Sequence, residues 1–177
     1  MEAQMLGAVV VSSDTLTPLV EEIARRYGVD PNLVKGIIKQ ESNWDVNASR
    51  YEAHLNDSSW GLMQVLLSTA KATLGNNNLT ISQLVSPETN ITAGTKFIAS
   101  QLARYGGNVR DAIAAYNAGS ARKSQDGKYA NQSYVDSVYR NYMMYKTIGT
   151  VITPQIASLG IGTFALLGLG IVLVSRR

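Results

Sequence analysis

The segment "NLVKGIIKQESNW" (residues 32–44) decides how the rest of the chain is interpreted. Asp30 is a good N-cap residue and Pro31 suits the first helical position, so we expect a helix from residue 31 to Glu41 or Ser42. On this helix, Glu41 shares one face with apolar side chains, namely Val34, Ile37 and Ile38. An ionisable carboxyl group is therefore placed on an apolar face in the last turn of the helix.

The position of Glu41 favours a protonated carboxyl group. Partial burial disfavours the charged form, and the C-terminal end of a helix carries partial negative charge. A carboxyl group that stays protonated near neutral pH can deliver a proton to a leaving oxygen. From the spacing alone, Glu41 is either such a general acid or an ordinary surface residue.

Helix signals also dominate the remainder of the chain. Ser86 and Asn108 are expected N-caps, and Gly119 is an expected helix stop. Helices are predicted over residues 18–27, from about residue 68, and over 87–105, 109–118 and 133–146. The polar stretch 43–59 is expected to be a loop, and no segment indicates paired strands. The tyrosines of the last of these helices are interpreted as packing residues.

Composition narrows the chemistry without selecting a function. The chain has 177 residues, a formal charge of +3 and no cysteine, which excludes disulfides, thiolate metal sites and thiol catalysis. A modest positive charge suits an anionic partner such as a cell-wall polymer, a lipid headgroup or nucleic acid.

The two ends of the sequence differ. The first residues, "MEAQMLGAVVVSSD" (1–14), lack a basic region and a clear cleavage site, so they make a poor signal peptide. Residues 156–174 are uncharged, and a helix of that length rises about 28 Å, close to a bilayer core. We therefore expect an N-terminal segment (1–16), a helical domain (17–147) and a single transmembrane anchor (148–177), whose glycines would allow an oligomer.

Four motifs occur in order: "ES" (41–42), "GLMQV" (61–65), "NITAGTKFI" (90–98) and "AIAAYNAG" (112–119). Together they resemble the catalytic domain of the soluble lytic transglycosylase family, which is related in fold to goose-type lysozyme. The resemblance covers about residues 17–145. It implies a mainly α, lysozyme-like domain, here followed by the expected transmembrane helix.

The resemblance also implies roles for individual residues. Glu41 resembles the sole catalytic acid/base of the family, and Ser42 its neighbour, which orients the carboxyl group and the substrate. Tyr116 matches the tyrosine that hydrogen-bonds this glutamate, and Asn117 a groove residue beside the N-acetylated sugar. The segment that lines the sugar groove opposite the acid matches Gly61, Leu62, Met63 and Gln64.

The chemistry implied by the resemblance is cleavage of the β-1,4 bond between N-acetylmuramic acid and N-acetylglucosamine in peptidoglycan. Glu41 would protonate the leaving oxygen, and the C6 hydroxyl would close a 1,6-anhydro ring. The expected partners are glycan strands, and a bilayer through residues 156–174. Neither a metal nor another cofactor is needed, and nucleic acid is not expected.

The loop after Glu41 is longer than in many family relatives. Its acids offer a second carboxylate for a hydrolase, although they also fit a solvated loop; they are Asp45, Glu52 and Asp57. Its aromatic residues suit either sugar stacking or packing; they are Trp44, Tyr51 and Trp60. The single histidine, His54, is expected to be exposed.

Other functions fit less of the sequence. Residues 18–41 allow a DNA-binding helix-turn-helix, but that leaves three motifs unexplained. A non-catalytic, membrane-anchored wall-binding protein does not account for Glu41. A goose-type lysozyme-like hydrolase of the same bond is the nearest alternative. The expected anchor without an export signal suggests the membrane of a bacteriophage virion, or else a bacterial inner membrane with the domain facing the periplasm.

Overall fold

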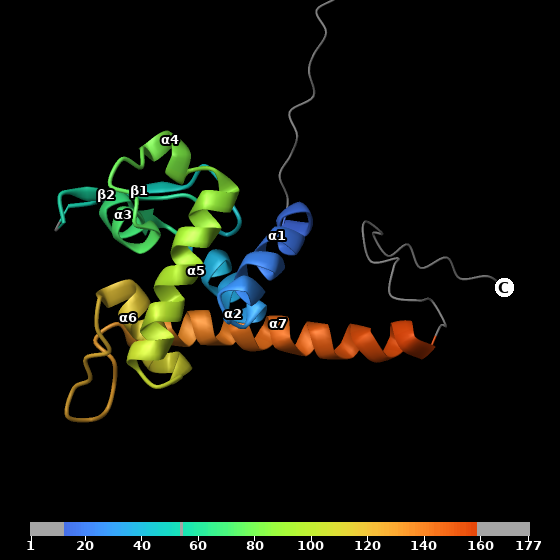
Figure 1. The fold of residues 1–177 in the computed structure, drawn as a ribbon. Coiled ribbons are helices and arrows are strands. Elements are labelled where there is room, and N and C mark those ends of the chain that lie inside the picture. Colours follow the sequence, from blue (N-terminus) through green and yellow to red (C-terminus); the bar gives the residue numbers. More distant parts are fainter. Residues whose placement is uncertain (1–12, 54, 159–177) are drawn as a thin grey trace, which may run out of the picture.

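Two helices that are distant in the sequence form the centre of the domain. The computed structural model describes residues 13–53 and 55–158, and in it α2 (Pro31–Glu41) packs against α7 (Gln132–Ser158) (Figure 1). Gly36 lies at their crossing, where an added Cβ would come within 2.9 Å of the Tyr142 backbone nitrogen. The missing side chain therefore allows the two helix backbones to approach closely.

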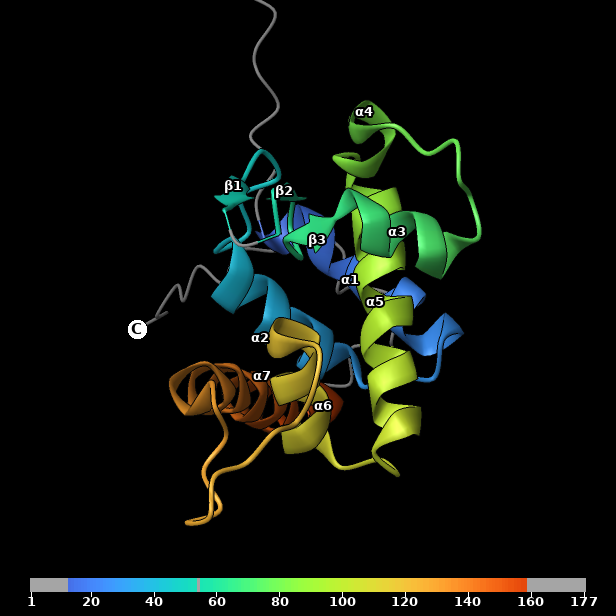
Figure 2. The same ribbon diagram turned by 90° about the vertical axis from the view of Figure 1, so that its left-hand side faces the viewer.

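Three further helices complete the helical core. α1 (Ser13–Arg26) packs on α2 and on the long helix α5 (Pro87–Arg104), and α6 (Val109–Ala118) packs on α5 and α7. The inward faces of these helices form one apolar core, whose fully buried members include Val20, Ile23, Val34, Ile37, Ile38, Ile98, Ile113 and Val138. This core holds α2 with its C-terminal end directed toward the sheet (Figure 2).

Three predicted helix caps are confirmed, whereas α1 begins at Ser13 and not at the predicted residue 18, so that Pro18 lies inside the helix. The Asp30 carboxylate accepts the backbone N–H of the second helical residue at 2.9 Å, and the Ser86 and Asn108 side chains accept first-turn N–H groups at 3.4 and 3.1 Å. Gly119 ends α6 with φ = 71°, in the left-handed region that glycine adopts without strain.

The prediction that residues 43–59 form an irregular loop is wrong. β1 (Ser49–Glu52), β2 (Asp57–Trp60) and β3 (Val65–Leu66) form an antiparallel sheet in the order β1-β2-β3. The strands are short, and β1 and β2 are mostly polar, so they lack the alternation that marks a longer half-buried strand. Two short helices follow, α3 (Leu67–Leu74), as predicted, and α4 (Ile81–Leu84), which was not predicted.

The expected fold class, a mainly α domain followed by a transmembrane helix, needs correction. Within residues 13–53 and 55–158, no helix is long and apolar enough to cross a membrane. α7 continues past the predicted end at Lys146 to Ser158, and charged residues such as Asp136 and Arg140 interrupt its apolar positions. The expected anchor at 156–174 begins inside α7 and otherwise lies outside the described residues. The expected bilayer contact, oligomer and virion setting all depended on that segment.

Replacing Gly36 by alanine tests the crossing of α2 and α7. The new methyl group would meet backbone atoms of Tyr142 at 2.9 and 3.1 Å and the Val138 carbonyl at 3.3 Å, none of which can move cheaply. We expect Gly36→Ala to lower the free energy of unfolding by about 1–3 kcal/mol in urea denaturation. Helix propensity alone predicts the opposite sign, a gain of about 1 kcal/mol. Gln40→Ala, on the exposed face of the same helix, is the matched control.

Candidate active site

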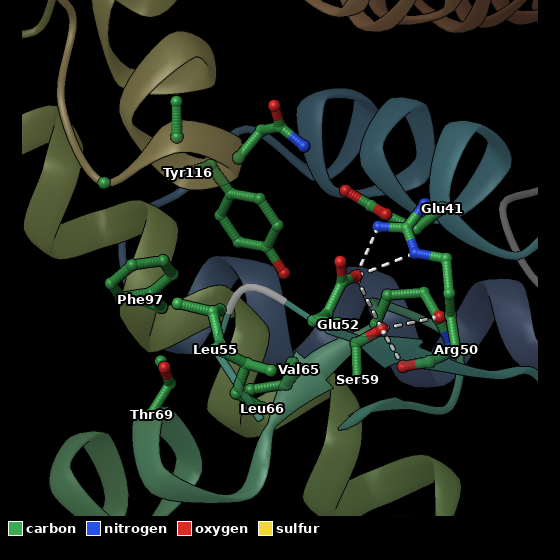
Figure 3. A pocket seen from close by; sticks show the side chains of 14 residues that line it. Glu41, Arg50, Glu52, Leu55, Ser59, Val65, Leu66, Thr69, Phe97 and Tyr116 are labelled. Carbon is green, nitrogen blue, oxygen red and sulfur yellow. Dashed lines mark hydrogen bonds and ion pairs between the residues drawn. The ribbon is translucent and has the colours of Figure 1, made fainter. Parts of the chain in front are cut away.

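A groove with a volume of about 580 Å³ opens beside the C-terminal end of α2 (Figure 3). Its walls come from α2, the sheet, α3, α5 and α6. They are formed by Glu41, Arg50, Glu52, Leu55, Ser59, Gln64, Val65, Leu66, Thr69, Phe97, Tyr116, Asn117, Ala118 and Gly119. The groove therefore brings the predicted acid together with residues from four other parts of the chain.

Glu41 is held by a tyrosine that the sequence analysis did not select. The hydroxyl of Tyr134, in the first turns of α7, donates a hydrogen bond to Glu41 Oε1. The expected partner, Tyr116, instead donates to the Met63 carbonyl oxygen at 2.8 Å, so that prediction is wrong. Tyr134 lies on a helix face with other tyrosines that pack, and nothing in its spacing distinguishes it from them.

The environment of Glu41 suits an acid that works near neutral pH. Burial raises the pKa of its carboxyl group from 4.5 to about 7, because the charged form loses solvation. The hydrogen bond from Tyr134 and the positive charge of Arg50 oppose this rise, and the negative charge of Glu52 adds to it. Burial has the largest effect, so Glu41 is largely protonated below about pH 7.

Behind the groove wall, the carbonyl groups of the loop at residues 60–63 are hydrogen-bonded by side chains. Each of its four consecutive carbonyl oxygens accepts a hydrogen bond from a side chain. In chain order, the donors are Asn90, Gln64, Ser42 and Tyr116, at 2.8, 2.9, 2.8 and 2.8 Å. Buried carbonyl groups need partners, and this loop finds them in side chains of α2, α5 and α6 as well as in its own glutamine.

Asn90 is the most deeply placed of these donors. Its side chain is fully buried, gives Nδ2 to the carbonyls of Trp60 and Leu84, and takes the Met63 N–H on Oδ1 at 2.8 Å. Gly61 makes room for it, because a Cβ there would lie 2.6 Å from Asn90 Nδ2. Asn90 thus fixes both ends of the loop to α5.

The predicted substrate-binding residues divide into two groups. Gln64, Tyr116 and Asn117 line the groove with Glu41. The Gln64 amide is occupied within the protein, since Nε2 also donates to the Ala48 carbonyl and Oε1 accepts from Ser59. The other four lie behind the wall and support the loop; they are Ser42, Gly61, Leu62 and Met63.

The acidic and aromatic residues of the extended loop also differ in whether they line the groove. Of the three acids, only Glu52 lines the groove; Asp45 and Asp57 do not. Trp44 is buried in the core and donates to the Tyr145 hydroxyl at 3.1 Å. Trp60 is half-buried against the core and Tyr51 is exposed, while His54 lies outside the described residues. Across the part of the chain that the structure describes, no three His, Cys, Asp or Glu side chains gather as metal ligands would.

Replacing Tyr134 by phenylalanine tests how the acid is tuned. The hydrogen bond lowers the pKa of Glu41, so its loss raises that pKa above about 7. If Glu41 must be protonated to act, wild-type kcat/KM on glycan strands falls as pH rises through about 7, and in Tyr134→Phe this fall moves to higher pH. Tyr116→Phe is the control, because Tyr116 bonds Met63. An unchanged pH profile in Tyr134→Phe would contradict this role.

Replacing Asn90 by alanine tests the support of the loop. The substitution leaves the Met63 N–H and two carbonyl groups without their partner, so we expect the free energy of unfolding to fall by at least about 2 kcal/mol in urea denaturation. Asn76→Ala, which removes an exposed contact to a loop N–H, is expected to cost less than about 1 kcal/mol. Equal losses in the two variants would show that Asn90 has no special structural role.

Comparison with known proteins finds relatives that are named as lytic transglycosylases. Named relatives include membrane-bound lytic murein transglycosylase C from Haemophilus ducreyi, 31% identical over 70% of this chain and 38% of its own length. The Yersinia pestis protein of the same name is 34% identical over 58% of this chain and 31% of its own length. The chain thus spans about a third of the length of each of these relatives, both of which are named as membrane-bound.

Solved structures show the same fold. An inactive variant of the lytic transglycosylase Slt from Pseudomonas aeruginosa superposes with a TM-score of 0.63 at 22% identity, over 75% of this chain and 24% of that one. The 70 kDa soluble lytic transglycosylase of Escherichia coli gives 0.52 at 25% identity, over 71% and 18%. The family model described as "Transglycosylase SLT domain" matches residues 18–137, more than half of the 177 residues. The chain therefore belongs to the transglycosylase SLT domain family.

Proposed function

We propose that the protein is a peptidoglycan lytic transglycosylase. It cleaves the β-1,4 bond between N-acetylmuramic acid and N-acetylglucosamine and leaves a 1,6-anhydro end on the muramic acid. The observation that carries this proposal is Glu41, an acid with a pKa of about 7 in the wall of an open groove. Family membership and the two named transglycosylase relatives support the same activity.

The first step needs one proton donor. Glu41 gives its proton to the glycosidic oxygen as the bond from C1 to that oxygen breaks, and the acetyl oxygen of the muramic acid bonds to C1. The Glu41 carboxylate that remains is stabilised by the Tyr134 hydroxyl and by the charge of Arg50. Proton transfer is easier because both groups favour the product of that transfer.

The second step returns the proton. The C6 hydroxyl oxygen of the same sugar displaces the acetyl oxygen from C1, and its proton passes to the Glu41 carboxylate. The reaction consumes no water, requires no metal or other cofactor, and restores Glu41 to its starting state. The side chains of Asn117 and Phe97 line the same groove and offer a polar and an apolar contact for the sugars.

Hydrolysis of the same bond is the second candidate function. The position of Glu52 in the groove favours it, because conventional glycosidases use two carboxylates. The two functions differ in their products, since hydrolysis leaves a reducing end in place of an anhydro ring.

Mass spectrometry of digested peptidoglycan tests the proposal. The full chain is incubated with purified peptidoglycan at pH 6, beside Glu41→Gln and a control, Glu88→Gln, on the first turn of α5 outside the groove. We expect anhydro-muropeptides from the wild type and the control, and a loss of about 10²–10⁴-fold in Glu41→Gln, which cannot donate a proton.

Other product patterns identify the alternatives. Reducing-end products from the wild type would make the protein a goose-type lysozyme-like hydrolase. No cleavage by the wild type, together with retained binding to the polymer, would leave a non-catalytic wall-binding protein.

A further inference from the structure

A pair of oppositely charged side chains lines the same groove as Glu41. Arg50 and Glu52 project from β1, and the Arg50 guanidinium donates from Nε and Nη2 to a single Glu52 oxygen, Oε1, at 2.7 Å each (Figure 3). The Ser59 hydroxyl, from β2, contacts the same oxygen at 3.4 Å. Both charges affect the pKa of Glu41, so the two carboxyl groups share one electrostatic environment.

The other oxygen of Glu52 is available to a ligand. Every side-chain contact that the described residues make with the Glu52 carboxylate ends on Oε1, and none of those residues donates to Oε2. The Glu52 side chain is only 18% exposed, whereas its partner Arg50 is 62% exposed. A carboxylate that is largely shielded from solvent, lines a groove and has one oxygen without a donor is placed to accept a hydrogen bond from what the groove binds.

The contacts of Glu52 suit a fixed negative charge. A guanidinium group stays protonated at all ordinary pH values, so the carboxylate beside it is paired with a permanent cation. Glu41 lacks such a direct pair and is protonated near neutrality. Two carboxyl groups in different environments take different roles: Glu41 moves the proton and Glu52 supplies charge.

Resting on the proposed transglycosylase reaction, we propose that Glu52 Oε2 accepts a hydrogen bond from the N-acetyl N–H of the muramic acid that is cleaved. When the acetyl oxygen bonds to C1 and the glycosidic bond breaks, positive charge spreads onto the acetyl nitrogen. A fixed carboxylate at that N–H stabilises the charged transition state more than the neutral amide of the substrate. When the C6 oxygen later displaces the acetyl oxygen, the proton goes to Glu41 and Glu52 is unchanged.

Steady-state kinetics on a defined glycan fragment test this role with the full chain. Glu52→Gln keeps the shape of the side chain but removes its charge. Because Glu52 raises the pKa of Glu41, kinetics are compared at pH 5, where Glu41 is protonated in both proteins. We expect kcat to fall about 10- to 100-fold, as for one charge-assisted hydrogen bond, with KM changed less than about threefold and anhydro products retained.

The matched control is Asp57→Asn, in the next strand of the same sheet. Asp57 contacts the Ser58 N–H and the Ser68 hydroxyl and does not line the groove. It undergoes the same loss of one charge, so its kcat is expected to stay within about twofold of the wild type. An equal loss in both variants would overturn the proposal, because it would reflect the net charge of the sheet.

Binding of a stable analogue gives a readout besides activity. A thiazoline analogue of the cyclised N-acetyl intermediate presents a protonated ring nitrogen where the acetyl N–H would be. By calorimetry we expect it to bind Glu52→Gln about tenfold more weakly than the wild type, while an N-acetylglucosamine tetramer binds both about equally.

Three further results would overturn the assignment of Glu52. They are an unchanged kcat in Glu52→Gln, an unchanged thiazoline affinity, and reducing-end products that Glu52→Gln abolishes, which would make Glu52 a water-binding base. If Glu52→Gln does not fold, Glu52→Asp is used instead, because it moves the carboxylate back by one methylene. A wild-type affinity for the thiazoline in Glu52→Asp would also overturn the assignment of Glu52. Failure of the proposed function is seen separately, in a wild type that makes no anhydro product.

Discussion

The hydrogen bonds to the carbonyl groups of residues 60–63 are the constraint on which the groove depends. The loop begins at Trp60, the last residue of β2. Its carbonyls at residues 60, 62 and 63 accept hydrogen bonds from side chains of α5, of the C-cap of α2 and of α6. A buried carbonyl group left without its donor would cost about 1–3 kcal/mol. The donor side chains reach these carbonyls only when the three helices are in place. The loop therefore fixes the distance between the helix that carries Glu41 and the opposite wall of the groove.

Around the groove, different residues set the pKa of Glu41 and support the loop at residues 60–63. Ser42 and Tyr116 donate hydrogen bonds to carbonyl groups of the loop. The Tyr134 hydroxyl and the charges of Arg50 and Glu52 instead affect the pKa of Glu41. Burial has the largest effect on the pKa of Glu41, so that pKa stays raised, at about 7, although Tyr134 and Arg50 both lower it. The buried face of α2, which includes Ile37 and Ile38, thus continues up to Glu41, and burial accounts for the raised pKa of its carboxyl group.

Local signals made most of the helices, and the position of Glu41 on an apolar face, predictable from sequence. Asp30, Ser86 and Asn108 act within a turn of their own positions, and the face that holds Glu41 follows from helical spacing alone. The sheet was missed because β1 and β2 pair polar residues across a turn. The assignment of Tyr116 as the partner of Glu41 was also wrong. The observed partner, Tyr134, is placed by the crossing of α7 and α2 at Gly36, a contact between distant parts of the chain.

The order of these parts along the chain has a consequence for synthesis. Glu41 and the loop that supports it are translated early, but the tyrosine that holds the carboxyl group comes 93 residues later, on the helix that covers α2. A nascent chain that has emerged only through α6 has the acid but neither its partner nor the surface that buries α2. The environment proposed to activate Glu41 is therefore complete only after α7 has been translated, so a chain that ends before α7 would lack the proposed activity.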